Sequence, residues 1–141
     1  MRILLGVAAA SALLLAGCSG DPTATDPEKV FADGFETPIE RVHIEAEGGT
    51  VVRGYDAWLK IVPRSQLTAR RESEFHYIDC AGPRAYLSKA LGSDELSSGH
   101  AHLDCLGLID ERFAFDNGRW VIRNRSNGRV YFRVWKHYSN P

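Results

Sequence analysis

The chain has 141 residues, with 17 Lys and Arg against 18 Asp and Glu, and a formal net charge of −1 at pH 7. Its hydrophobic fraction of 44% is that of an ordinary globular protein, and its length suits one hydrophobic core and is too short for two. The near-neutral balance excludes a protein that binds nucleic acid through its overall charge.

The first twenty residues have the composition of an export signal. Met1 and Arg2 give a positive start, and residues 3–15 are almost wholly apolar. This apolar stretch is shorter than the roughly 18 to 20 residues that a membrane-spanning helix needs, and it fits a secretory signal peptide. We therefore expect residues 1–17 to be removed.

The motif Leu15-Ala16-Gly17-Cys18 follows this stretch and resembles the lipobox of bacterial lipoproteins. The resemblance covers residues 1–19 only. It implies cleavage before Cys18 and attachment of acyl chains such as palmitate to that cysteine, which anchor the protein to a membrane. Because Ser19, and not Asp, follows the cysteine, the resemblance also implies the outer membrane, with the protein facing the periplasm.

The rest of the chain divides into a tether and one domain. Residues 18–30 are rich in Pro, Asp, Thr and Ser and have no apolar period, which is typical of a flexible tether. Residues 31–141 are expected to form a single globular domain, with Phe31 and Phe35 docking the chain onto its edge.

Two cysteines remain once Cys18 is assigned to lipid. An even pair in an exported chain indicates a disulfide, so Cys80 and Cys105 are predicted to be bonded to each other. Closing the loop between them would add roughly 3 kcal/mol to stability. Two separately buried thiols are the alternative.

The first half of the domain has mainly the period of β-strands. Apolar and polar residues alternate over 42–46 and again over 51–62, with Gly48 and Gly49 as a turn signal between them. A third strand is expected over 67–78. A short amphipathic helix is predicted over 83–91, with Gly92 as its stop, followed by a polar loop over 93–99 and a strand over 100–109.

Residues 113–138 predict a C-terminal three-stranded meander with turns at Asn117-Gly118 and Asn127-Gly128. A two-residue turn is expected at the first. At the second, a three-residue loop over 126–128 with a left-handed Gly128 keeps apolar residues on one face. The whole pattern predicts an α+β fold, with a mainly antiparallel sheet of five to seven strands and one short helix.

This register creates an unusual surface. Phe113, Phe115, Trp120, Ile122, Val130, Phe132 and Val134 would face the core. The opposite face would combine cationic and aromatic side chains, and its predicted partner-binding residues are Arg119, Arg123, Arg125, Arg129, Tyr131, Arg133 and Trp135.

The charge distribution along the chain agrees with a basic face. Residues 112–141 carry seven Lys and Arg against one acid, whereas residues 18–111 carry nine against seventeen. Arginine offers forked donors to carboxylate or phosphate groups, and aromatic rings add apolar contact area. An acidic envelope protein or another anionic envelope component is the expected partner. Alternatively, the acidic part of the chain could pack on this face.

A weaker pattern suggests metal binding. His100, His102 and Asp104 alternate, so that a strand would direct them to one side, and His76 would be brought near by the Cys80–Cys105 bond. The alternative is a solvated loop that enters a strand.

No motif predicts an enzyme or a cofactor. The chain has no serine-hydrolase elbow, phosphate-binding loop or HExxH motif, and a disulfide would leave no free thiolate. The expected function is therefore a non-enzymatic binding module tethered in the envelope, such as an inhibitor or immunity-type protein. A metal-binding or enzymatic domain that uses the histidine cluster is the alternative.

Overall fold

The computed structural model describes residues 26–51, 54–99, 101–112 and 115–138. The predicted signal peptide, Cys18, His100 and Phe113 lie outside the described residues. Within the described part of the chain, no helix combines the length and the hydropathy needed to cross a membrane.

The centre of the fold is a six-stranded antiparallel sheet with the strand order β1-β2-β6-β5-β4-β3. The strands are β1 (Val42–Thr50), β2 (Gly54–Pro63), β3 (His76–Tyr77), β4 (Leu103–Arg112), β5 (Phe115–Asn124) and β6 (Val130–Tyr138). This arrangement confirms the predicted α+β fold with a C-terminal three-stranded meander, but the meander consists of β4, β5 and β6 and thus starts earlier than the predicted residue 113.

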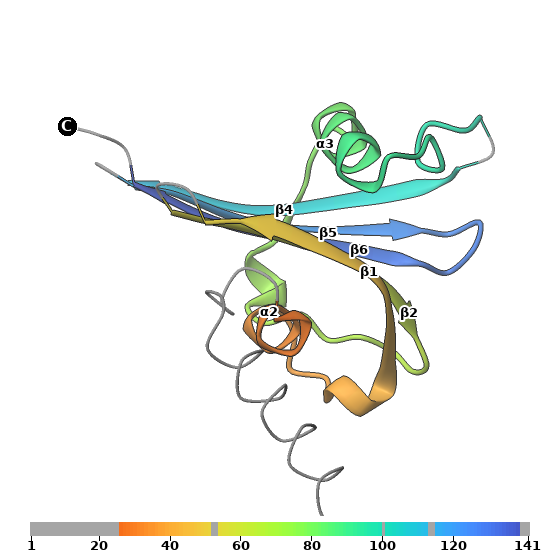
Figure 1. Ribbon diagram of the computed structural model, residues 1–141, viewed down its shortest axis with the longest axis horizontal. Coiled ribbons are helices and arrows are strands. Elements are labelled where there is room, and N and C mark those ends of the chain that lie inside the picture. Colours follow the sequence, from red (N-terminus) through yellow and green to blue (C-terminus); the bar gives the residue numbers. More distant parts are fainter. Residues whose placement is uncertain (1–25, 52–53, 100, 113–114, 139–141) are drawn as a thin grey trace, which may run out of the picture.

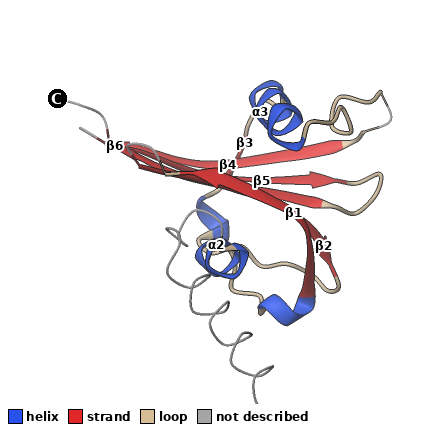
Figure 2. Ribbon diagram, viewed as in Figure 1, coloured by secondary structure: helices blue, strands red, loops and turns tan. Residues whose placement is uncertain are grey.

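Helices cover both faces of the sheet. Helix α2 (Pro27–Gly34) lies below the sheet in Figure 1 and helix α3 (Ala81–Leu91) lies above it. Short 3-10 helices occur at Ile39–Arg41 and Glu72–Glu74. Figure 2 shows that the β-sheet separates the two α-helices throughout. The middle of the sheet is therefore covered on both faces.

Helix α2 was not predicted. Asp26 caps it by accepting hydrogen bonds from the backbone N–H groups of Glu28 and Lys29, and Pro27 occupies the first turn, where no backbone donor is needed. Val30 and Phe31 are buried. Residues 27–30 thus belong to a helix of the domain and not to the tether that was predicted over 18–30.

The core on the α2 side joins this helix to the middle of the sheet. Its buried residues are Val30, Phe31, Phe35, Val42, Ala57, Leu59, Ile61, Leu67, Ala69, Val121, Val130, Phe132 and Val134. Phe35 stacks on Phe31 and meets the ring of Phe132 edge to face, with ring centroids 4.9 and 5.2 Å apart. Phe31 and Phe35 are therefore central core residues, not residues of the domain edge.

The core on the α3 side is smaller and contains the disulfide. Its buried residues are Leu87, Leu96, Cys105, Ile122 and Tyr131. The predicted Cys80–Cys105 bond is confirmed and joins the start of α3 to β4. The predicted stop at Gly92 is also confirmed, because this residue caps α3 in the left-handed conformation with φ of 64°.

Two predictions about the first strands are wrong. Gly48 and Gly49 continue β1 and do not form a turn, because Gly48 pairs with Trp58 and the indole occupies the space that a Cβ would need. The predicted strand over 67–78 is mostly loop. Only its last part, β3, pairs with β4.

The predicted turn at Asn117-Gly118 is also wrong. Both residues lie within β5, where Gly118 pairs with Ile109 of β4 and Trp135 of β6. The indole of Trp135 packs directly on Gly118 and leaves no room for a Cβ. The glycine thus serves close packing between strands and not chain reversal.

The second predicted turn has the expected glycine but a different register. Gly128 is left-handed, with φ of 76°, as predicted. However, the loop also includes Arg125, because the N–H of Asn124 donates to the carbonyl of Arg129. Strand β6 is therefore shifted by one residue from the predicted register, and Val121 pairs with Phe132.

Candidate functional site

The shifted register divides the predicted basic face between the two sides of the sheet. Paired residues of antiparallel strands share a face. Arg119 and Arg123 pair with core residues of the α2 side. Tyr131, Arg133 and Trp135 lie on the α3 side, where Tyr131 belongs to the core. The predicted face with all seven residues is therefore wrong.

Most of the positive charge of β5, β6 and the loop between them is neutralised by acids from earlier in the chain. The ion pairs are Arg119–Asp33, Arg123–Glu72, Arg125–Asp104, Arg129–Glu45 and Arg133–Asp56. The basic C-terminal part of the chain thus pairs largely with its acidic N-terminal part within the fold. This agrees with the alternative expectation that the acidic part of the chain packs on the basic face.

Arg133 is enclosed and unavailable to a partner. Its guanidinium lies 3.7, 4.6 and 4.5 Å from the ring centroids of Tyr86, Trp120 and Trp135. The Tyr86 hydroxyl donates to Asp56, the acid that binds Arg133. Burial, followed by this hydrogen bond, raises the pKa of Tyr86 to about 12. Trp135, predicted to be a surface residue, is buried.

Tyr131 is likewise a core residue. It is fully buried, and its hydroxyl donates to the carboxylate of Glu95, 2.5 Å away. Burial, and then this hydrogen bond, raise its pKa above the ordinary value. Glu95 also binds the ammonium group of Lys60 at 2.8 Å. This arrangement fixes the loop after α3 to the sheet and leaves no part of Tyr131 for recognition.

Three of the predicted residues remain together at the end of the β5–β6 hairpin. Arg123, Arg125 and Arg129 line a groove of about 260 Å³, which we call the hairpin groove. Its other lining residues are Pro63, Ser65, Gln66, Leu67, Asn124, Gly128 and Val130. The hairpin tip forms the right-hand end of the sheet in Figure 1.

The arginines of the hairpin groove are accessible. The exposed fractions of the side chains of Arg125, Arg123 and Arg129 are 71%, 38% and 36%. Their ion pairs are therefore solvated, and solvated pairs contribute little to stability. The hydrogen bond from Arg129 lowers the pKa of Glu45 and keeps that carboxyl ionised. A carboxylate of a ligand can replace such partners at small cost.

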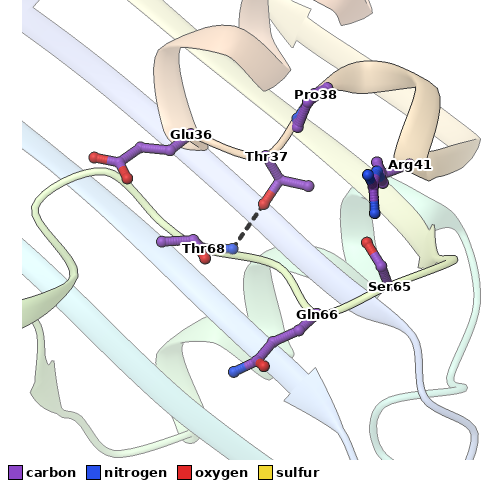
Figure 3. A pocket seen from close by; sticks show the side chains of 7 residues that line it. All are labelled: Glu36, Thr37, Pro38, Arg41, Ser65, Gln66 and Thr68. Atoms are coloured by element: carbon purple, nitrogen blue, oxygen red, sulfur yellow. Dashed lines mark hydrogen bonds between the residues drawn. The ribbon is translucent and has the colours of Figure 1, made fainter.

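A second groove adjoins the first. It has a volume of about 270 Å³, and it shares Ser65 and Gln66 with the hairpin groove. Figure 3 shows Arg41 and Ser65 pointing toward each other across it, and Thr37 accepting a hydrogen bond from the backbone N–H of Thr68. Among the described residues, the guanidinium of Arg41 has no acidic partner. It thus adds a fourth cationic group to this end of the molecule.

The predicted metal ligands are not brought together in the part of the chain that the structure covers, which holds no group of three or more His, Cys, Asp or Glu side chains arranged to bind a metal. Asp104 binds Arg125 at 2.5 Å. His102 is exposed before β4, and His76 is exposed on β3 opposite Gly107.

Comparison with protein-family models found no match, and no curated protein or solved structure is significantly similar to the chain.

Sequence reasoning missed the wall of the hairpin groove that faces the arginines. Residues 63–67 form this wall, and the expected strand over 67–78 concealed it. The available signal was the polar run Arg64-Ser65-Gln66 after Pro63, which is typical of a loop. It also missed Asp56 and Tyr86, whose contact with Arg133 depends on the pairing of β2 with β6.

Proposed function

We propose that the protein is an envelope-tethered binding module without enzymatic activity, and that its hairpin groove receives an acidic segment of a partner protein. The observation that carries this proposal is the set of three accessible arginines around one groove. Inhibitor or immunity-type proteins act in this way, because they need only a stable scaffold and a complementary surface.

The composition of the groove favours a protein segment over a simple anion. Leu67 and Val130 give it apolar lining, and Pro63 adds to it, whereas the arginines stand around these residues. An acidic peptide can place an apolar side chain in the groove while its carboxylates bind the guanidinium groups. A free phosphate would use the charges alone.

The test is a titration followed by NMR of the backbone amides. The probe is a peptide of six glutamates with one leucine inserted at its centre. It should shift the amide resonances of residues 124–129 and 65–67, and added salt should weaken its binding. The double variant Arg125→Glu/Arg129→Glu should bind roughly tenfold more weakly. Arg71→Glu is the matched control, because Arg71 is an exposed, ion-paired arginine that does not line this groove.

The outcomes separate the possible ligands. Equal binding by the double variant and by the control would remove the hairpin groove as the site. Stronger shifts with inorganic phosphate than with the peptide would contradict a protein partner.

The envelope address has an independent test. Protein recovered from membranes should have the mass of residues 18–141 plus acyl chains, and Cys18→Ser should abolish this addition. An unmodified Cys18 in membrane-derived protein would contradict the lipid anchor.

A further inference from the structure

A third groove lies on the α3 side of the sheet, beside the end of β1. It has a volume of about 520 Å³ and is lined by residues 48–50 of β1, Trp58 of β2, and Tyr86, Lys89 and Ala90 of α3. The α3 residues are three and four positions apart, so they form one face of the helix. We call it the edge groove.

The floor of the edge groove is low because β1 carries small side chains there. Ala46, Gly48 and Thr50 pair with Lys60, Trp58 and Asp56, and they share the α3 side of the sheet with them. A Cβ on Gly48 would lie 2.6 Å from Nε1 of Trp58. The indole thus extends over the glycine and forms a wall of the groove.

Beside this groove, no other described strand pairs with the outer edge of β1. Strand β1 is the first strand of the sheet, and among the described residues it pairs with β2 only. Alternate residues of an edge strand direct their N–H and C=O groups away from the sheet, where another strand can bind them.

The edge is protected over one half only. A register shift between Ile44 and Ala46 and the charged Glu45 and Glu47 are features that discourage pairing along the first half of β1. From Gly48 to Thr50 neither feature is present. The unprotected part of the edge, the last three residues of β1, is therefore the part that borders the groove.

Lys89 indicates the charge of the occupant. Its ammonium group is exposed at the rim of the edge groove and forms no ion pair within the described part of the chain. Trp58 and Tyr86 give the interior an apolar and aromatic lining. An extended peptide in this position would direct alternate side chains to the α3 side, one toward the rings and another toward Lys89.

We propose that residues 48–50 bind an extended peptide segment as an additional strand, with an apolar side chain in the edge groove and an acidic side chain two positions away at Lys89. The main chain of β1 provides affinity and the groove provides selectivity. This site is independent of the hairpin groove, and neither proposal depends on the other.

The test uses a phage library of random nine-residue peptides selected against the full chain in detergent. The recovered peptides should lack proline and share an apolar residue and an acid two positions apart. A synthetic copy should shift the amides of 48–50 and the indole N–H of Trp58, and leave those of 124–129 unchanged.

Two variants and one control make the result decisive. The Lys89→Glu variant should bind the recovered peptide at least about threefold more weakly. In a new selection against this variant, the recovered peptides should carry a basic residue where the first consensus has the acid. Ala90→Trp should fill the groove and abolish binding. Lys29→Glu, a charge reversal on α2 at the other face, should change nothing.

Three outcomes would overturn the proposal. One is that selection against the original protein enriches no peptides beyond those that selection against the Ala90→Trp variant enriches. Another is that selection against Lys89→Glu recovers peptides with the same consensus sequence as selection against the original protein. The third is a shift of the Trp58 indole with chitotetraose and not with the peptides, which would assign the groove to a glycan.

Discussion

Asp56 holds Arg133 with both of its carboxylate oxygens. Nε of Arg133 lies 3.0 Å from Oδ1, and Nη2 lies 2.6 Å from Oδ2. Only 14% and 13% of the Asp56 and Arg133 side chains are exposed, and three aromatic rings surround the guanidinium. This pair joins β2 to β6 and to α3, so its role is structural.

Arg133→Met should destabilise the fold by about 3 kcal/mol, because it leaves a mostly buried carboxylate without its cation. Urea unfolding followed by circular dichroism measures the change. Arg71→Met is the control, since it breaks an exposed pair with Glu74 and should cost less than about 1 kcal/mol. Equal costs for both variants would contradict a structural role for the Asp56–Arg133 pair.

Gly118→Ala should destabilise the protein by about 1 to 3 kcal/mol, because the added methyl group collides with the indole of Trp135. Gly82→Ala is the matched control. It places a methyl group in open space at the start of α3 and should change stability by less than about 1 kcal/mol, because the clash with Pro83 that a Cβ meets before a proline offsets the gain in helix propensity. A thermal melt distinguishes the two, and a neutral Gly118→Ala would contradict the observed register of β5 and β6.

Some local signals in the sequence predicted local features correctly, although the turn signals at Gly48-Gly49 and Asn117-Gly118 did not. The disulfide, the glycine at the end of α3 and the left-handed Gly128 each depend on one or two residues with a specific conformational or chemical property. The fold class followed from the alternation of apolar residues along the strands. These features need no knowledge of which strands are neighbours.

The register of the hairpin could not be predicted because both faces of the sheet are buried. Val121 and Ile122 are adjacent, apolar and almost fully buried, one on each side. If the register of the two strands shifts by one residue, the apolar residues of one face replace those of the other face. The alternation of apolar and polar residues therefore does not favour either register. The error in the partner-binding face follows from this ambiguity.

Helix α2 was missed for a different reason. Its capping residue and first-turn proline lie in a run rich in Asp, Pro and Thr, and this composition is typical of a tether. The helix is stabilised mainly by Val30, Phe31 and Gly34, which are buried against the sheet. Such tertiary packing outweighs local composition.

Acid should destabilise the fold through Glu95. Burial acts to raise its pKa, but hydrogen bonds from Lys60 and Tyr131 outweigh that effect and hold the pKa below its usual value. The unfolded state therefore binds a proton at a higher pH than the folded state does. The stability that this carboxylate contributes is present above its ordinary pKa, about 4.3, and is lost as the pH falls through the lowered value.

Glu95→Gln should reduce this loss, which is measured as the free energy of unfolding in urea between pH 7 and pH 3. The exposed Glu40→Gln variant should keep the pH dependence of the original protein. An identical pH dependence in Glu95→Gln would show that the Glu95 carboxylate does not contribute.

Removal of the disulfide should loosen one side of the molecule. The Cys80→Ala/Cys105→Ala double variant should lose roughly 3 kcal/mol. Because the bond joins the start of α3 to β4, hydrogen exchange should accelerate in α3 more than in α2. Equal acceleration in both helices would contradict this local effect.

Because its inner strands are paired on both sides, the sheet can present unpaired backbone groups to other molecules only along its rim. The hairpin tip and the outer border of the first strand both belong to that rim and contribute little to the interior. Substitutions of exposed side chains at either place can therefore accumulate without unfolding the molecule, although Gly48 is excluded because the Trp58 indole leaves no room for a Cβ there. Descendants of one ancestral scaffold could in this way acquire different recognition properties while the interior stays almost constant.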